Sequence, residues 1–201
     1  MPLAKQSLAV ALFIYSGAAL AQNYPPVPGP GYVYSIPYAG YPTYAAAGNS
    51  GLSAAGDAMC ISGSNTRNIR IRKIGFSATS STAAVVTVSV VLRSSIDTAT
   101  NSNIITPVAL DQTYAPATAV VTGYDTSGTP GALVGMVRSA KLAVNTTGNS
   151  STIGSYLFEF NPVPLMLRGS SQFACINTSA AGTGASIAVM VEFEETTAST
   201  N

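Results

Sequence analysis

The acid–base chemistry open to this chain rests on its carboxylates, because it has eight acidic residues and no histidine. Glu192 and Glu194 are two positions apart in an alternating segment, so they face the same side of a strand. A glycosidase uses two carboxylates about 5–9.5 Å apart. Like charges on a terminal strand, however, more often form a solvated face that protects an edge from aggregation. Arg70 and Arg72 also share a face and are predicted to pair with these glutamates across the sheet, so we expect no catalysis there.

The other residue types exclude most catalytic and metal sites. Without histidine, a Ser-His-Asp or Cys-His arrangement cannot form, and zinc and transition metals lose their commonest ligand. The two cysteines lie too far apart in the chain for a metal-ligand spacing. No phosphate-binding loop motif occurs, and Gly182-Thr183-Gly184 is typical of a turn between strands. The sequence therefore predicts a protein that is not an enzyme and needs no cofactor or metal.

Cys60 and Cys175 are the only cysteines, and each falls within a predicted strand. In an oxidising compartment they would most simply pair, joining a strand near 57–62 to one near 171–177. A disulfide that closes so long a loop is worth about 4–5 kcal/mol in the chain-entropy model. In a reducing cytoplasm the same residues would be two small buried hydrophobic side chains. The sequence leaves both states open.

The composition describes a surface with very few charges. Charged residues make up 8% of the chain, apolar residues 47%, and the net charge is +1. No basic footprint for nucleic acid or for an anionic membrane exists. A nearly neutral surface built from Ser, Thr, Asn, Gly and Ala promotes association. We therefore expect a homo-oligomer, with no nucleic-acid partner and no membrane partner after maturation.

Residues 1–21 have the features of a secretory signal. Lys5 follows the free amine, an apolar stretch runs from Leu8 to Ala21, and Ala19-Leu20-Ala21 is a small-x-small cleavage site before Gln22. Ser16 and Gly17 interrupt the apolar stretch, which is too short for a comfortable transmembrane helix. The alternative is an apolar segment that docks against a partner subunit.

Residues 22–52 are predicted to form an extended arm. Up to residue 44 the arm interleaves tyrosine with proline and carries no charge, and proline at this density forbids a helix or a central strand. Tyrosine supplies a large contact area at low entropic cost. We expect contacts with another subunit from five tyrosines: Tyr32, Tyr34, Tyr38, Tyr41 and Tyr44. The alternative is a flexible tether with incidental tyrosines.

Residues 53–196 read as one all-β domain, followed by a polar tail at 197–201. Short β-branched runs are separated by Gly, Asn and Ser clusters, which is typical of a β-sandwich, most simply of jelly-roll type. The predicted strands are 57–62, 68–77, 84–93, 118–124, 132–144, 153–160, 163–168, 171–177 and 185–194. Residues Asn161 to Pro164 contain two prolines and should interrupt a strand.

The stretch from Asn68 to Arg93 is predicted to be a long hairpin at the centre of this domain. Ile69 and Ile71 are at odd-numbered positions and Ile74 and Phe76 at even-numbered ones, so a regular strand would turn the two pairs to opposite faces. A β-bulge near Lys73 would absorb one residue and turn both pairs to the same face. In the second limb the aliphatic residues at 86, 88, 90 and 92 share one face, and in the last strand those at 187, 189, 191 and 193 do.

Several blocks of this domain resemble a family of small β-rich proteins encoded among the structural genes of tailed bacteriophages and prophages. The blocks are Ala54 to Asp57, Ile61 to Gly75, Leu92 to Ser95, Thr106 to Val108, Gly135 to Leu142 and Leu167 to Ser171. The resemblance spans about residues 53–195. It implies an accessory virion protein of the head or tail, whose partners are other copies of itself and neighbouring virion proteins.

Two features depart from that family. Cys60 and Cys175 stand where aliphatic residues are expected, and the hydrophobic and Tyr/Pro-rich N-terminal part is an addition. A secretion signal is at odds with a protein assembled into virions in the cytoplasm. The resemblance still implies a virion protein, and a trimer is the first expectation for a jelly roll. The alternative is a secreted bacterial surface or adhesion protein.

Overall fold

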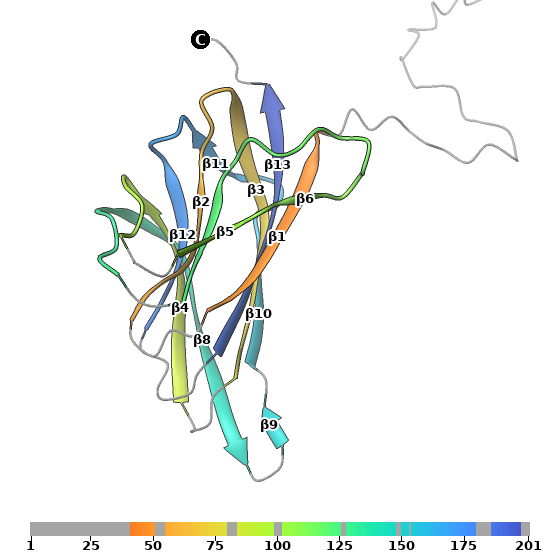
Figure 1. Ribbon diagram of the computed structural model, residues 1–201. Helices are drawn as coiled ribbons and strands as arrows, with labels where there is room; N and C mark the ends of the chain where they lie inside the picture. Colours follow the sequence, from red (N-terminus) through yellow and green to blue (C-terminus); the bar gives the residue numbers. More distant parts are fainter. Residues whose placement is uncertain are drawn as a thin grey trace, which may run out of the picture. The chain divides into compact units, whose positions relative to one another are not determined.

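The structure is a computed structural model and describes residues 41–50, 55–79, 84–98, 102–125, 128–147, 150–152, 154–179 and 186–197. The chain divides into Met1–Tyr38 and Ala39–Asn201, and all described residues belong to the second unit. Within the described residues the fold is all-β (Figure 1). These residues contain no helix long and apolar enough to cross a membrane.

One antiparallel sheet has six strands. Its strands follow the order β10–β3–β13–β1–β6, and β11 also pairs with β3. The strands are β1 (Thr43–Ser50), β3 (Arg67–Thr79), β6 (Val108–Ala109), β10 (Gly154–Glu159), β11 (Leu165–Arg168) and β13 (Ser186–Thr197). Residues Asn161 to Pro164 separate β10 from β11, which confirms the predicted interruption.

The second antiparallel sheet has seven strands in the order β5–β7–β2–β12–β4–β8–β9. They are β2 (Gly56–Ser62), β4 (Ala84–Arg93), β5 (Ser102–Ile105), β7 (Val121–Tyr124), β8 (Leu133–Thr147), β9 (Ser150–Thr152) and β12 (Phe173–Thr178). Figure 1 shows the two sheets as two layers of this domain. The β-sandwich predicted from the alternating strands is confirmed at this level.

The two sheets share one apolar core. From the first sheet Ile71, Val191 and Phe193 are fully buried, and from the second Ile61 and Val88 are. The alternation predicted for the last strand holds, because the odd-numbered residues 187–193 are buried and their neighbours are partly exposed. Each such side chain contributes about 1.5–3 kcal/mol when it leaves water. This core fixes which face of every strand is turned outward.

The predicted hairpin over residues 68–93 is wrong. β3 and β4 lie in different sheets, and β4 pairs instead with β12 and β8. The pairings of the long strands are nested along the chain: β1 pairs with β13, β2 with β12, β3 with β10 and β11, and β4 with β8. A period of two identifies a strand and its buried face but not its partner, which is why the hairpin was a reasonable but incorrect expectation.

The predicted β-bulge near Lys73 is confirmed. Glu192 is opposite Lys73, but the next residue, Phe193, is opposite Ile71, so Arg72 is the extra residue on β3. The shift allows residues of both parities, such as Ile71 and Ile74, to point into the same core.

All nine predicted strands are present, and the structure adds β1, β5, β6 and β9. β1 falls within the predicted arm of residues 22–52, so the domain begins earlier in the chain than residue 53. Ala45 and Ala46, which lie within β1, gave a weak strand signal, because alanine has low β propensity. Pairing with β13 over its whole length outweighs that preference.

Tyr44, which the sequence predicted as a subunit contact, instead lies in the core. It is 2% exposed, stacks on Phe193 with ring centroids 5.5 Å apart, and donates a hydrogen bond of 2.8 Å to the Ala115 carbonyl oxygen. Burial and the Glu195 carboxylate raise the pKa of its hydroxyl, while Arg67 opposes this shift. Tyr44 therefore acts within the domain.

Replacing Tyr44 by alanine should lower the free energy of unfolding by about 3–5 kcal/mol, because it empties an aromatic site in the core. Tyr44→Phe, which removes only the hydrogen bond, should cost about 1 kcal/mol. The matched control is Tyr41→Ala, on a half-exposed ring, which should cost less than about 1 kcal/mol. Urea unfolding of the full chain measures all three. Equal losses for Tyr41→Ala and Tyr44→Ala would contradict the core assignment.

Candidate functional site

A second, smaller buried cluster lies on the outer side of the seven-stranded sheet. Its apolar members are Cys60, Val91, Tyr124 and Cys175, with Phe173 packed against them. They alternate with core residues such as Ile61 and Val90 along the same strands, so they point away from the sandwich core. This cluster is the densest group of chemically distinctive side chains among the described residues.

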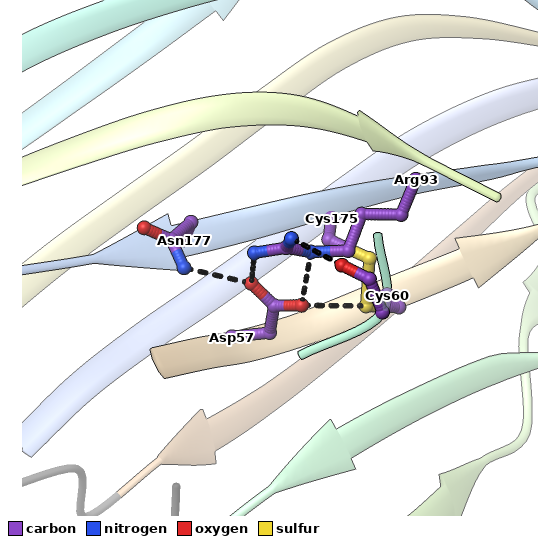
Figure 2. The surroundings of a disulfide bond; sticks show 6 residues. Asp57, Cys60, Arg93, Cys175 and Asn177 are labelled. Atoms are coloured by element: carbon purple, nitrogen blue, oxygen red, sulfur yellow. Dashed lines mark hydrogen bonds and ion pairs between the residues drawn. A yellow bond between two sulfur atoms is a disulfide. The ribbon is translucent and has the colours of Figure 1, made fainter. Parts of the chain in front are cut away.

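An ion pair between Asp57 and Arg93 is at the centre of this cluster. Arg93 Nε lies 2.6 Å from Asp57 Oδ2, and Arg93 Nη2 donates to Asp57 Oδ1 at 2.7 Å. Asp57 is fully buried and Arg93 is 8% exposed. Figure 2 shows Asp57 between Asn177 and the disulfide, with the guanidinium of Arg93 alongside. Nη2 thus donates a hydrogen bond to one carboxylate oxygen, and Nε makes an ion-pair contact with the other, so both oxygens of Asp57 face the guanidinium.

Two further groups complete the surroundings of the carboxylate. Asn177 Nδ2 donates to Asp57 Oδ1 at 2.8 Å, and Cys60 Sγ lies 3.8 Å from Asp57 Oδ2. Asp57, Arg93 and Asn177 come from the neighbouring strands β2, β4 and β12. The carboxylate thus ties together the three central strands of the seven-stranded sheet.

Cys60 and Cys175 form a disulfide in the structure. They stand directly opposite each other on β2 and β12, with their Cα atoms 4.0 Å apart. Both are almost completely buried. The bond therefore joins the same two strands that Asp57 and Asn177 link, and it closes a chain separation of 115 residues.

The connections after β4 and before β8 cover this cluster. Arg93 Nη1 donates to the Gly131 carbonyl oxygen at 2.7 Å, and Ser94 N donates to the Ala132 carbonyl oxygen at 3.1 Å. Gly131 has no room for a side chain, because a Cβ atom there would overlap the Ser95 backbone. This close approach of the two connections keeps water away from the ion pair.

Tyr124 belongs to the same cluster and is fully buried. Burial raises the pKa of its hydroxyl strongly, and the nearby carboxylates of Asp97 and Asp57 add to the rise, while a backbone hydrogen bond with Asp97 opposes it. The tyrosine is therefore neutral at physiological pH and is not a nucleophile or a base.

The chemistry that this cluster can perform is structural. Asp57, Cys60 and Cys175 place their ligand atoms within 4.8 Å of one another, which is a spacing that a metal could use. However, disulfide sulfurs are not thiolate ligands, and both carboxylate oxygens already contact Arg93. These residues therefore hold strands together and do not form an open metal or catalytic site.

The carboxylates considered for catalysis are engaged in surface ion pairs. Glu194 lies 2.9 Å from Arg72 Nε and 3.6 Å from Arg70 Nε. Glu192 lies 3.3 Å from Lys73 Nζ. The predicted pairing of Arg70 and Arg72 across the sheet is confirmed for Glu194, whereas Glu192 pairs with Lys73 instead.

Of the predicted contact tyrosines, Tyr32, Tyr34 and Tyr38 lie outside the described residues. Tyr41 is 44% exposed, and its ring centroid lies 5.0 Å from the guanidinium carbon of Arg70. Sequence reasoning missed the partnership of Asp57 with Arg93 and Asn177. The sequence did contain one indication. Val91 and Arg93 alternate with the core residue Val90, so they lie on the opposite face of β4, which was expected to face solvent. An apolar residue such as Val91 on that face indicates that another part of the chain covers it.

Comparison of the chain with protein-family models, curated proteins and solved structures gives no match.

Breaking the Asp57–Arg93 pair should strongly destabilise the domain. Arg93→Met and Asp57→Asn should each lower the free energy of unfolding by about 3–5 kcal/mol, because each leaves a buried polar partner unsatisfied. The double variant should lose less than the sum of the two. Arg168→Met, on an exposed arginine of β11, is the control and should change stability by less than about 0.5 kcal/mol. Strictly additive losses in urea unfolding would contradict a coupled pair.

Removing the disulfide should cost about 4–5 kcal/mol of unfolding free energy, because the unfolded chain regains the freedom of a loop of 115 residues. The variant with Cys60→Ala and Cys175→Ala, compared with the oxidised full chain in urea, measures this loss. Thiol titration of the denatured, unreduced chain provides the check and should find no free thiol. Two titratable thiols together with unchanged stability of the variant would show that the cysteines are not bonded.

Proposed function

We propose that this protein is a non-enzymatic structural component of a tailed-phage virion, an accessory protein of the head or tail that assembles through its N-terminal arm. The nested order of its strands is the observation that carries this proposal. The resemblance of residues 53–195 to phage structural proteins supports it from the sequence side. The Asp57–Arg93 cluster contributes stability to the component.

The strand order supports a jelly roll. When β10 and β11 are taken as one strand and the short strands β5, β6, β7 and β9 are left out, the domain has eight strands. The first pairs with the last, the second with the seventh, the third with the sixth and the fourth with the fifth. Two sheets with this nested pairing are what a jelly roll requires. The fold is frequent in viral capsid and lectin domains, so it supports a virion or binding role by analogy.

The surface also suits an assembly. Large apolar side chains are exposed where β5 and β6 extend the two sheets, among them Ile104 at 77%, Val108 at 66% and Leu110 at 60%. With a net charge of +1, copies of the chain do not repel one another. Exposed apolar groups gathered in one region are typical of interaction surfaces.

A secreted surface or adhesion protein is the second candidate, and the disulfide favours it. Disulfides persist in the periplasm, outside the cell and on virion and cell surfaces, but are rare in the cytoplasm. Together with the signal-like residues 1–21, the Cys60–Cys175 bond fits export as well as a released virion.

The native N-terminus distinguishes the two candidates. For a virion component we expect an intact start, read by mass spectrometry of protein that sediments with phage particles in a density gradient. A mature chain that begins at Gln22 and stays in the particle-free fraction would rule out the virion role and support the secreted one. A host-encoded cell-surface protein of the same particle preparation serves as the control for contamination.

A further inference from the structure

An open groove of about 580 Å³ lies on the six-stranded sheet. It crosses four hydrogen-bonded strands, β1, β13, β3 and β10. Ala47, Met190, Gly75 and Leu157 form one register-aligned row across it. Ala46, Val189, Phe76 and Phe158, each next to one of them along its strand, are buried. The groove is thus a hollow in the outer face of a sheet, where backbone groups are already paired, so it offers contact area and not a strand edge.

Small side chains produce this hollow. Gly75 stands in the middle of the row, and a Cβ atom there would lie 3.1 Å from Met190 Cε and 3.5 Å from Leu157 Cδ1. The adjacent row contains Ala188, Ser77 and Ser155. Glycine inside a strand often marks a place where another chain or a ligand comes close to the backbone.

Among the residues that the structure describes, none with a charge lines the groove. The next row along the same face contains Glu192, Lys73 and Glu159, of which Lys73 and Glu192 are paired with each other. Beyond this row, Arg70 and Arg72 are paired with Glu194. An occupant that brought a charge into the groove would lose hydration without gaining a partner. The groove therefore suits an uncharged, largely apolar segment.

The segment from Gln22 to Gly40 of this chain has that chemistry. It contains four tyrosines, five prolines and no charged residue among 19 residues. Proline prevents continuous pairing with a sheet edge, so such a segment binds through its side chains against a face. In a polyproline conformation it would span roughly 59 Å at about 3.1 Å per residue. Four strands are about 14 Å across, so about five residues suffice to cross the groove.

The place where this segment joins the described residues also favours the assignment. Tyr41 follows it directly, and the ring of Tyr41 lies over Arg70 on the outer face of the same sheet. From Tyr41 the groove row at Ala47 is about 20 Å along β1. The point of attachment of the segment, Tyr41, therefore lies on the grooved face.

We propose that the groove is the docking site for residues 22–40 of a neighbouring copy of this chain. The inference rests on the proposed function in one respect, that copies assemble through the arm, and it names the surface that receives the arm. Tyr32, Tyr34 and Tyr38 are the anchors, because tyrosine combines a large contact area with few rotatable bonds. Met190 and Leu157 are the side chains that the rings contact.

A second cavity of about 320 Å³ fits this occupant less well. Val134, Met166 and Phe173 line it, but so do the charged Arg93 and the polar Ser171 and Gln172. Residues 22–40 carry no carboxylate that could pair with Arg93.

Photochemical crosslinking of the full chain tests the proposal. A photoreactive phenylalanine derivative replaces Tyr34, and equal amounts of isotopically heavy and light protein are mixed, dissociated and reassembled. We expect crosslinked peptides that join a heavy arm to light residues around Gly75 or Met190, and the reverse. Crosslinks only within copies of one label, crosslinks to other surfaces, or no crosslinks at all would overturn the proposal.

Filling the groove gives an independent measurement. Gly75→Val should raise the concentration at which the oligomer half-dissociates by about tenfold or more, measured by light scattering, because it occupies the space of the arm. Ala188→Val is the second variant if the first is poorly folded. Ala45→Val, on β1 in the row of Glu192 outside the groove, is the control and should leave dissociation unchanged. Unchanged dissociation of folded groove variants would overturn the proposal.

These readouts are separate from the test of the virion role. A chain that starts at Gln22 and is secreted retains residues 22–40, so its arms can still crosslink between copies. If the protein is secreted but its arms still crosslink to the groove, the groove proposal stands and the virion proposal fails. If the protein associates with particles but its arms do not crosslink to the groove, the virion proposal stands and the groove proposal fails.

Discussion

The structure depends on the burial of aliphatic side chains between two sheets. Each long strand turns one apolar face towards this core, and its opposite face takes no part in that burial. Because only the inner face is needed for folding, β3 tolerates an extra residue at Arg72, and β1 tolerates a run of alanines. The bulge is required by the same constraint, since without it Ile74 and Phe76 would point to the solvent.

The two outer faces have been used differently. On the seven-stranded sheet, the disulfide and the Asp57–Arg93 pair are covered by chain connections, so polar and covalent links hold the central strands together. On the six-stranded sheet, the outer face remains open, with paired charges towards one end and an uncharged groove towards the other. The first arrangement stabilises one copy of the domain, and the second leaves a surface for another chain.

This division agrees with a component of an assembly. A disulfide buried beside an ion pair suits both of the proposed settings of this domain, a virion or a cell surface, because disulfides persist there. An exterior with few charges and several exposed aliphatic side chains is a poor design for a solitary protein but a suitable one for a protein in contact with copies of itself. Residues 22–40, which we propose to bind in the groove, would add contact area between copies without bringing a charge into it.

The sequence by itself determined the strands and their inner faces, because a period of two is a local property that each segment carries. It also determined the bulge near Lys73, the interruption at Asn161 to Pro164 and the pairing of Arg70 and Arg72 with glutamate. Only the tertiary structure decided which strands are neighbours, because the pairings are nested and join residues far apart in the chain, such as β1 with β13. The alternation of Val91 and Arg93 with Val90 indicated a covered outer face on β4, but it could not show that Asp57 and Asn177 lie there, and nothing local indicated that Tyr44 is buried. Each depends on strands brought together by long-range pairing, for which no local signal exists.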